Sequence, residues 1–169
     1  MATILEACEF TAAMTADVQG FICGSEEWEL DMANWITGQR VITAIADSKN
    51  EAQVWLYYSG DFLVGFGSLA KTRWPWPMPD GKHQNLAIIP ALAIQSTFKG
   101  KPEGVTEKSE KFSNLLMSDL IAKARLRGVP GLVLFAHPKN TPAIRLYSGF
   151  GFIAFELGKN GFLRMGMPL

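Results

Sequence analysis

The chain has 169 residues, 48% of them hydrophobic, and its 16 basic and 16 acidic side chains give a formal net charge of zero. This length predicts one domain, and the apolar share excludes a disordered or low-complexity chain. The balanced charge excludes the overall positive field that is typical of nucleic-acid-binding proteins.

The first 38 residues predict a strand and two helices. Thr3–Glu9 is compatible with a short strand, and apolar residues recur at helical spacing over Thr11–Cys23. Ser25 is a plausible N-cap of a second helix, which would end near Gly38. Trp28 belongs to an aromatic stripe of that helix. Such a stripe faces the core or contacts a ligand.

A hairpin and an irregular loop follow. Gln53–Tyr58 and Phe62–Ala70 are rich in aromatic and β-branched residues and are joined by a short polar turn, which predicts two antiparallel strands. Arg73–Gly81 contains three prolines and predicts an extended loop. Its tryptophans, Trp74 and Trp76, would cover the core or line a pocket.

The next elements alternate between strand and helix. Leu86–Ile94 is a nearly continuous apolar run that predicts a buried strand. Pro90 cannot donate to a ladder, so we expect a bulge or a local splay there. After a loop over Lys99–Thr106, helical spacing continues through Phe112–Leu126, and Gly131–Ala136 predicts a second buried strand.

The chain closes with a short helix and two strands. Thr141 with Pro142 predicts an N-cap with proline in the first turn of a helix that ends near Gly149. Phe152–Glu156 and Phe162–Met167 predict the last strands. The alternation of strand and helix predicts a mixed sheet that contains a parallel pair.

Several classes of protein are excluded by what the sequence lacks. The uncharged segment from His83 to Phe98 is too short and polar to span a bilayer, and the N-terminus lacks the pattern of a secretory signal. Cys8 and Cys23 are too few for a disulfide framework, which favours a reducing, cytoplasmic compartment. No P-loop, HExxH or GxSxG string is present, so we expect neither phosphoryl transfer nor a metal.

Charge is unevenly distributed along the chain. Nine acidic residues stand against two basic ones between Glu9 and Asp61, a net charge of −7, whereas Lys99 to Arg127 carries a net charge of +3. These segments are either solvated surfaces or the two oppositely charged sides of a binding site.

The segment Leu132–Phe152 (LVLFAHPKNTPAIRLYSGFGF) carries the most specific pattern. Asn140, Ala143, Tyr147 and Gly151-Phe152 closely resemble the N-x-x-A-x-x-x-Y-x-x-x-G-F signature of the GNAT superfamily of acyl-CoA-dependent N-acyltransferases. The resemblance extends over roughly residues 53–156.

The resemblance implies an α/β (α+β) fold with a mostly antiparallel sheet of six to seven strands, a central splayed parallel pair and about four helices, in one domain over residues 1–169. It implies transfer of an acetyl group from acetyl-CoA to a primary amine by direct attack, without a metal. The N–H of Leu92 would polarise the thioester carbonyl, and the main chain of Ile94 would bind the pantetheine arm.

The pyrophosphate loop departs from the family pattern. By resemblance, the loop residues Lys99, Gly100, Lys101 and Gly104 would bind the cofactor, but proline replaces the first glycine of the pattern and the loop is longer. An alignment on Leu115-Leu116 instead leaves no glycine in place. Lysines could compensate by meeting the phosphate charge directly.

The acid and base are assigned by the same resemblance. Tyr147 would protonate the departing thiolate, or else it packs against the closing strands. Asn140 would bind the cofactor arm or an ordered water, or else it caps a helix. His137 is one candidate for the general base, and a water chain or bulk solvent are the others.

The acceptor is the least constrained part of the prediction. The acidic first half favours a cationic small molecule or peptide amine, with Trp28, Trp74 and Trp76 as candidate substrate contacts. The alternatives are a catalytically weak acyl-CoA-binding sensor or interaction module and a toxin that acetylates aminoacyl-tRNA. The lack of net positive charge counts against the toxin. Both a monomer and a homodimer remain open.

Overall fold

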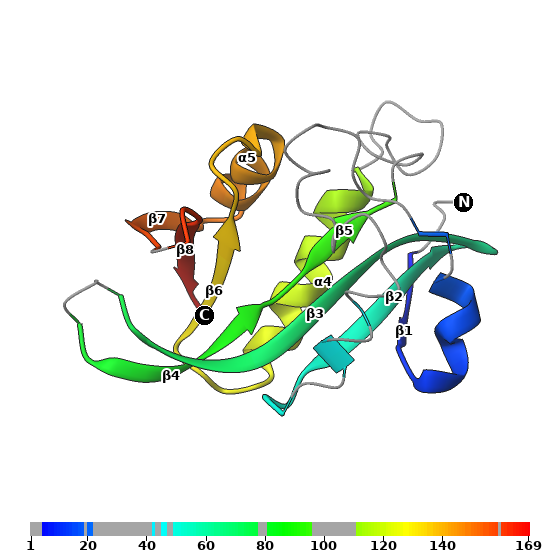
Figure 1. The fold of residues 1–169 in the computed structure, drawn as a ribbon, viewed down its shortest axis with the longest axis horizontal. Helices are drawn as coiled ribbons and strands as arrows, with labels where there is room; N and C mark the ends of the chain where they lie inside the picture. Colours follow the sequence, from blue (N-terminus) through cyan, green and yellow to red (C-terminus); the bar gives the residue numbers. More distant parts are fainter. Residues whose placement is uncertain are drawn as a thin grey trace.

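One sheet organises the molecule. The computed structural model describes residues 5–18, 20–21, 42, 45–46, 49–77, 81–95, 111–158 and 160–169. Within these residues, eight strands form the sheet in the order β1-β2-β3-β4-β6-β8-β7, with β5 paired to β3 (Figure 1). The strands are β1 (Glu6–Glu9), β2 (Gln53–Ser59), β3 (Phe62–Pro75), β4 (His83–Ile89), β5 (Leu92–Ile94), β6 (Gly131–Ala136), β7 (Ile153–Leu157) and β8 (Leu163–Pro168).

The pairing pattern confirms a mixed, mostly antiparallel sheet. All neighbouring strands are antiparallel except β4 and β6, which run parallel at the centre of the order. The prediction of six to seven strands was low by one, because the apolar run Leu86–Ile94 is divided at Pro90 into β4 and β5.

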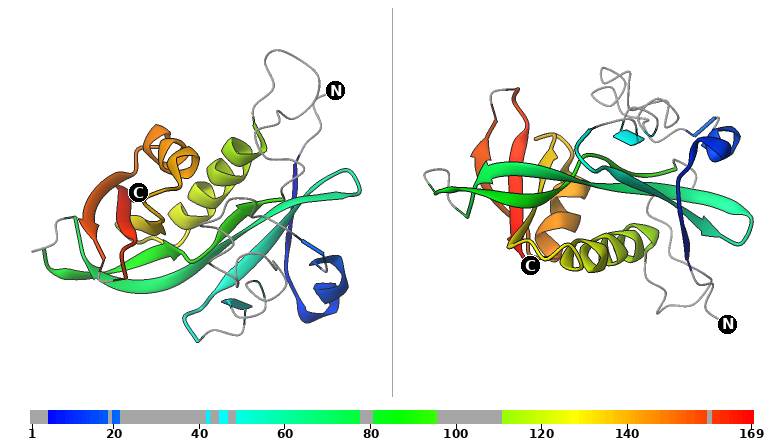
Figure 2. Two further views of the ribbon diagram at one scale, coloured as in Figure 1. Left: turned by 45° about the horizontal axis from the view of Figure 1, so that its top comes forward. Right: turned by 90° about the horizontal axis from the view of Figure 1, so that it is seen from below.

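Helices cover both faces of the sheet. In the described residues, α4 (Phe112–Arg125) and α5 (Thr141–Gly149) lie on one face, and the 3-10 helix η1 (Ala12–Val18) lies on the other (Figure 2). The helix predicted over Thr11–Cys23 is therefore a shorter 3-10 helix. The second predicted helix, which includes Trp28, lies outside the described residues.

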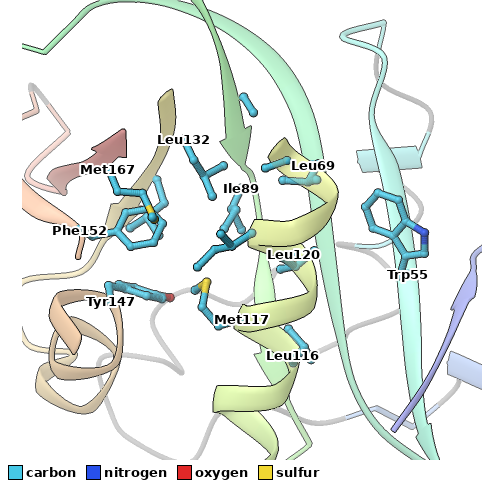
Figure 3. Close-up of a cluster of buried hydrophobic side chains, with 14 of the residues drawn as sticks. Trp55, Leu69, Ile89, Leu116, Met117, Leu120, Leu132, Tyr147, Phe152 and Met167 are labelled. Atoms are coloured by element: carbon cyan, nitrogen blue, oxygen red, sulfur yellow. The ribbon is translucent and has the colours of Figure 1, made fainter. Parts of the chain in front are cut away.

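The largest buried cluster lies between the sheet and the α4–α5 face (Figure 3). Apolar side chains of α4 recur every three or four residues and are buried against β2, β3, β4 and β6. Buried members of this cluster that Figure 3 labels include Trp55, Leu69, Ile89, Leu116, Met117, Leu120, Leu132, Tyr147, Phe152 and Met167. Helix α4 is thus fixed by packing along its whole length.

A tryptophan pair covers the opposite face where β6, β7 and β8 lie. The loop predicted over Arg73–Gly81 is wrong at its start, because β3 continues to Pro75. Trp74 and Trp76 are each 9% exposed, and they form an apolar cluster with Leu86 and Val133. Packing across the sheet therefore overrides the local preference of the prolines for irregular structure.

Gly166 of β8 makes this arrangement possible. A Cβ atom at position 166 would lie 2.2 Å from an atom of the Trp76 ring, a distance that real Cβ contacts do not reach. We expect Gly166→Ala to lower the free energy of unfolding by about 2 kcal/mol through overpacking. Urea denaturation measures this, with Gly149→Ala as control, because no atom lies within 4 Å of a Cβ at position 149. Equal stability of the two variants would contradict the packing of Trp76.

Candidate active site

The parallel strands β4 and β6 separate at one end. Their pairing register ends at Ile89 opposite Leu134. The next strand, β5, still pairs with β3 but no longer pairs with β6. We call the region between β5 and the last two residues of β6, Phe135 and Ala136, the strand divergence. Figure 1 shows β5 and β6 running apart from this point. Backbone pairing across the sheet is thus interrupted at its centre.

A one-residue bulge produces the divergence. On β3, Ala70 pairs with Ile88 and Gly67 pairs with Leu92, so three steps on β3 match four steps on the partner. The extra residue falls at the segment that contains Pro90, which confirms the predicted bulge. A bulge bends its strand and increases the local twist, which turns β5 away from β6.

The backbone of β5 presents polar groups to the divergence. Gln95 donates its N–H to the Val64 carbonyl at 2.7 Å, so alternate residues Ala93 and Gln95 direct their backbone groups toward β3. Leu92 and Ile94 therefore direct theirs the opposite way, toward β6. An extended amide-bearing ligand could pair with these groups as an added strand.

The N-terminus of α4 lies beside β5. A Cβ on Gly65 would lie 3.0 Å from the Ile94 side chain and 3.1 Å from the Leu116 side chain, which places these two residues together. Lys111, the N-cap of α4, makes no side-chain capping hydrogen bond. A helix N-terminus favours anions. The predicted cofactor-binding loop residues Lys99, Gly100, Lys101 and Gly104 lie outside the described residues.

Tyr147 lies on α5 and is buried between the two helices. Its ring packs 6.0 Å from that of Phe152, and its hydroxyl points toward Met117 of α4, in the cluster that also contains Ile89 (Figure 3). Burial raises the pKa of Tyr147 to about 12. The phenol therefore stays protonated throughout the neutral pH range, as an acid that donates a proton must.

The raised pKa of Tyr147 predicts a loss of stability in alkali. A pKa of about 12 in the folded chain against 10 as its ordinary value means that stability is full below pH 10 and falls as the pH rises toward 12. We expect a slope of about 1.4 kcal/mol per pH unit in this window from this residue. Urea denaturation of the wild type and Tyr147→Phe between pH 9 and 12 measures it, and parallel curves would contradict the assignment.

Asn140 is the N-cap of α5. Its side-chain oxygen accepts a hydrogen bond from the N–H of Ala143 at 3.2 Å. The N-cap expected at Thr141 is therefore wrong by one residue. The side chain of Asn140, not that of Thr141, accepts the hydrogen bond from a backbone N–H of the first turn. This observation supports the capping role of Asn140, and its role in cofactor binding stays a prediction.

His137 follows β6 directly, at the open end of the strand divergence. Its Nδ1 accepts a hydrogen bond from the backbone N–H of Lys139 at 3.1 Å, and its ring lies 5.4 Å from that of Phe162. This bond orients the imidazole against the loop that leads to α5. The role of His137 as a base stays a prediction.

The tryptophans predicted to contact substrate already have partners within the chain. The Arg164 guanidinium lies 4.8 Å from the Trp74 ring, and Phe155 lies 5.7 Å from the Trp76 ring. Glu156 holds the same guanidinium by an ion pair of 2.9 Å. Trp74 can therefore bind a cation, and in this structure the cation is Arg164. Contacts of Trp74 and Trp76 with substrate stay predictions.

A separate surface hollow of about 510 Å³ is lined by none of the predicted site residues. It is lined by residues of β2, β3 and β4 and of the turn after α4. Lys71 and Glu51 at this hollow form an ion pair of 2.6 Å, and Arg127 donates to Gln53. Its charged groups are therefore engaged with the chain itself.

No helix among the described residues is long and apolar enough to cross a membrane.

Comparisons with known proteins agree on the architecture. No family model and no curated protein matches the sequence. Among solved structures, a GNAT family acetyltransferase from Elizabethkingia anophelis with acetyl-CoA bound is 15% identical, with a TM-score of 0.60 over 98% of both chains. The PaiA N-acetyltransferase from Thermoplasma acidophilum, in complex with coenzyme A, is 14% identical, with a TM-score of 0.66 over 98% of this chain and 99% of that one.

The chain has the GNAT fold. A structure described as a bacterial toxin is similar as well, with a TM-score of 0.71 and 14% identity over 98% of this chain and 91% of that one. Ile94 and Tyr147 belong to the same buried cluster, and Leu92 packs against it. His137 lies at the end of the same strand β6, and Trp74 and Trp76 lie on the other face.

Proposed function

We propose that the chain is an N-acetyltransferase that transfers the acetyl group of acetyl-CoA to a primary amine. One observation carries the proposal: the strand divergence exposes the backbone groups of Leu92 and Ile94 toward β6, on the sheet whose helical face holds the protonated Tyr147. The GNAT fold, which structures with coenzyme A or acetyl-CoA bound also have, supports the same donor.

The residues present fit an acyl-CoA donor. Main-chain groups of Ile94 would pair with the amides of the pantetheine arm, as in strand addition. The N-terminus of α4, with Lys111 at its N-cap, would attract the pyrophosphate through the helix dipole. We assign the lysines of the preceding loop, Lys99 and Lys101, to the same phosphates.

The transfer needs a hydrogen-bond donor at the thioester oxygen and a proton donor at the thioester sulfur. Bound acetyl-CoA supplies an activated thioester. The N–H of Leu92 would hold the thioester oxygen as negative charge develops on it. As the amine nitrogen bonds to the acetyl carbon and the carbon–sulfur bond breaks, Tyr147 would give its hydroxyl proton to the sulfur. The ammonium proton leaves to His137 or to solvent, and the Tyr147 phenolate takes up a proton from solvent before the next turnover.

The acceptor is proposed to be a cationic amine. The segment Glu9–Asp61 carries a net charge of −7, and the Lys99–Arg127 segment, which includes α4, carries +3. An excess of acidic groups concentrates cationic substrates and repels carboxylates and phosphates.

A matched panel of cationic, neutral and anionic primary amines tests both transfer and charge preference. With acetyl-CoA as donor, we expect the highest kcat/KM for cationic amines and a fall of that value from low to physiological salt, where exposed charges are screened within about 8 Å. Preference for anionic amines, or no salt dependence with cationic ones, would contradict the charge assignment. Binding of acetyl-CoA without turnover of any amine would favour a sensor.

The second candidate function is acetylation of aminoacyl-tRNA. It is favoured by the similarity to the structure described as a bacterial toxin. The zero net charge counts against it, because tRNA binding draws mostly on contacts between basic side chains and phosphate. Tight binding of aminoacyl-tRNA at 0.15 M salt would support this candidate, and weak binding that vanishes with salt would count against it.

A further inference from the structure

A buried serine holds the bulge that produces the strand divergence. Ser68 of β3 is the buried polar residue of the described core and is fully inaccessible to solvent. Its Oγ accepts a hydrogen bond from the Ala91 N–H at 3.0 Å and donates one to the Ala91 carbonyl at 2.8 Å. One hydroxyl thus binds both backbone groups of the same residue.

These two bonds replace the ladder bonds that the bulge removes. Pro90 has no N–H to donate. Ala91 is 3% exposed, so its backbone groups have no access to solvent and would be unsatisfied without Ser68. The hydroxyl therefore makes the extra residue of the bulge tolerable in the centre of the sheet.

The position of the serine bond determines where regular pairing resumes. Leu92, the next residue, is the first of β5 to pair with β3, and its partner is Gly67, which precedes Ser68 in the chain. Ser68 and Ala91 thus fix the peptide whose nitrogen is the Leu92 N–H. Ala91 belongs to the cluster on the η1 face, together with Phe66, so the serine acts from the side of the sheet opposite Tyr147.

We propose that Ser68 is a positioning residue for acyl transfer, which aims the Leu92 N–H at the thioester oxygen by holding Ala91. The proposal rests on the proposed function, because it assumes that an acyl donor lies in the strand divergence. Ser68 itself touches neither substrate. Its hydroxyl acts through the peptide that joins Ala91 to Leu92.

The test compares Ser68→Ala and Ser68→Cys with Val54→Ala. The cysteine variant keeps the volume of the site but offers only a weak S–H donor, so it serves if the alanine variant does not fold. Val54 is buried in the same cluster on β2 and makes no hydrogen bond to Ala91 through its side chain. Val54 lies opposite Ser68 in the β2–β3 register, so Val54→Ala removes packing beside the serine and lowers stability but keeps the hydroxyl that binds Ala91.

The readouts are the infrared carbonyl frequency of bound acetyl-CoA labelled with carbon-13 at the acetyl carbonyl, its affinity by calorimetry, and kcat with the best amine of the panel. In the wild type, we expect the bound carbonyl to absorb at a lower frequency than in solution. In the Ser68 variants, this shift should shrink, and kcat should fall by about tenfold, a smaller loss than deletion of an oxyanion donor causes. Val54→Ala should keep both wild-type values.

Two results would overturn the proposal. Ser68 variants that lose stability as Val54→Ala does, but keep the wild-type carbonyl frequency and kcat, would show that Ser68 only supports the core. A wild-type chain that binds no labelled acetyl-CoA would overturn the proposed function itself. The calorimetric titration of the wild type separates this second result from the first before any variant is compared.

Discussion

Replacement of Tyr147 by Phe should lower kcat by about 10² or more while the affinity for acetyl-CoA stays nearly unchanged. The substitution removes only the hydroxyl, and among the described residues that hydroxyl makes no hydrogen bond whose loss would weaken the fold. The proton is needed when the carbon–sulfur bond breaks, so its removal affects the transition state and spares ground-state binding. Steady-state kinetics and calorimetry together measure the two quantities.

The control for Tyr147→Phe is Phe152→Leu. Phe152 packs against the Tyr147 ring and belongs to the same buried cluster, but it carries no proton to donate. We expect Phe152→Leu to lower stability and to change kcat much less than Tyr147→Phe does. If both variants keep wild-type kcat with bond breaking shown to be rate-limiting, Tyr147 only packs against the closing strands.

Deletion of the Leu92 N–H should lower kcat by roughly 10² to 10³, the range for loss of one oxyanion donor. Replacement of Leu92 by its α-hydroxy acid analogue converts the amide to an ester and removes the N–H while the side chain stays the same. Because this N–H points away from β3, no N–H of the β3–β5 ladder is lost, and the Ala91 carbonyl still accepts from Ser68, although an ester carbonyl is a weaker acceptor than an amide. Unfolding in urea should therefore change little.

The same ester replacement at Ile94 provides a matched contrast. Its N–H also points away from β3, but we assign it to the pantetheine arm. We expect the Ile94 ester to weaken acetyl-CoA binding and to leave kcat at saturating donor nearly unchanged. An equal loss of kcat for both esters, or a wild-type kcat for the Leu92 ester, would contradict the assignment of the oxyanion donor.

Local patterns predicted most of the strands and the two described α-helices. The continuous apolar run of Gly131–Ala136 matches β6 to the residue, because the run contains no polar position and all of its residues except Phe135 are buried. Pro90 within an apolar run correctly predicted the bulge, since a proline cannot take part in a central ladder.

The errors arose where distant residues decide the structure. The prolines near Trp74 predicted a loop, but β3 extends to Pro75 because the tryptophans pack on β6, β7 and β8. Those contacts join segments about 60 to 90 residues apart in the chain, which no local pattern contains.

The candidate site was predicted from a resemblance more than from the residues themselves. Leu92 and Ile94 act through backbone groups, so their side chains carry little signal. Ser68 was missed, although a serine within the apolar stretch LVGFGSLA is the kind of buried polar residue that must find a partner. Its partner Ala91 lies 23 residues away, beyond the reach of a local pattern.

Binding of acetyl-CoA to the folded chain is the central claim, and calorimetric titration of the purified protein with acetyl-CoA tests it most directly. The predicted result is saturable binding at one site, with an increase in unfolding free energy of about 2.7 kcal/mol at 100 times Kd. No heat of binding, together with no shift of Tm at millimolar acetyl-CoA in a sample shown to be folded, would contradict it.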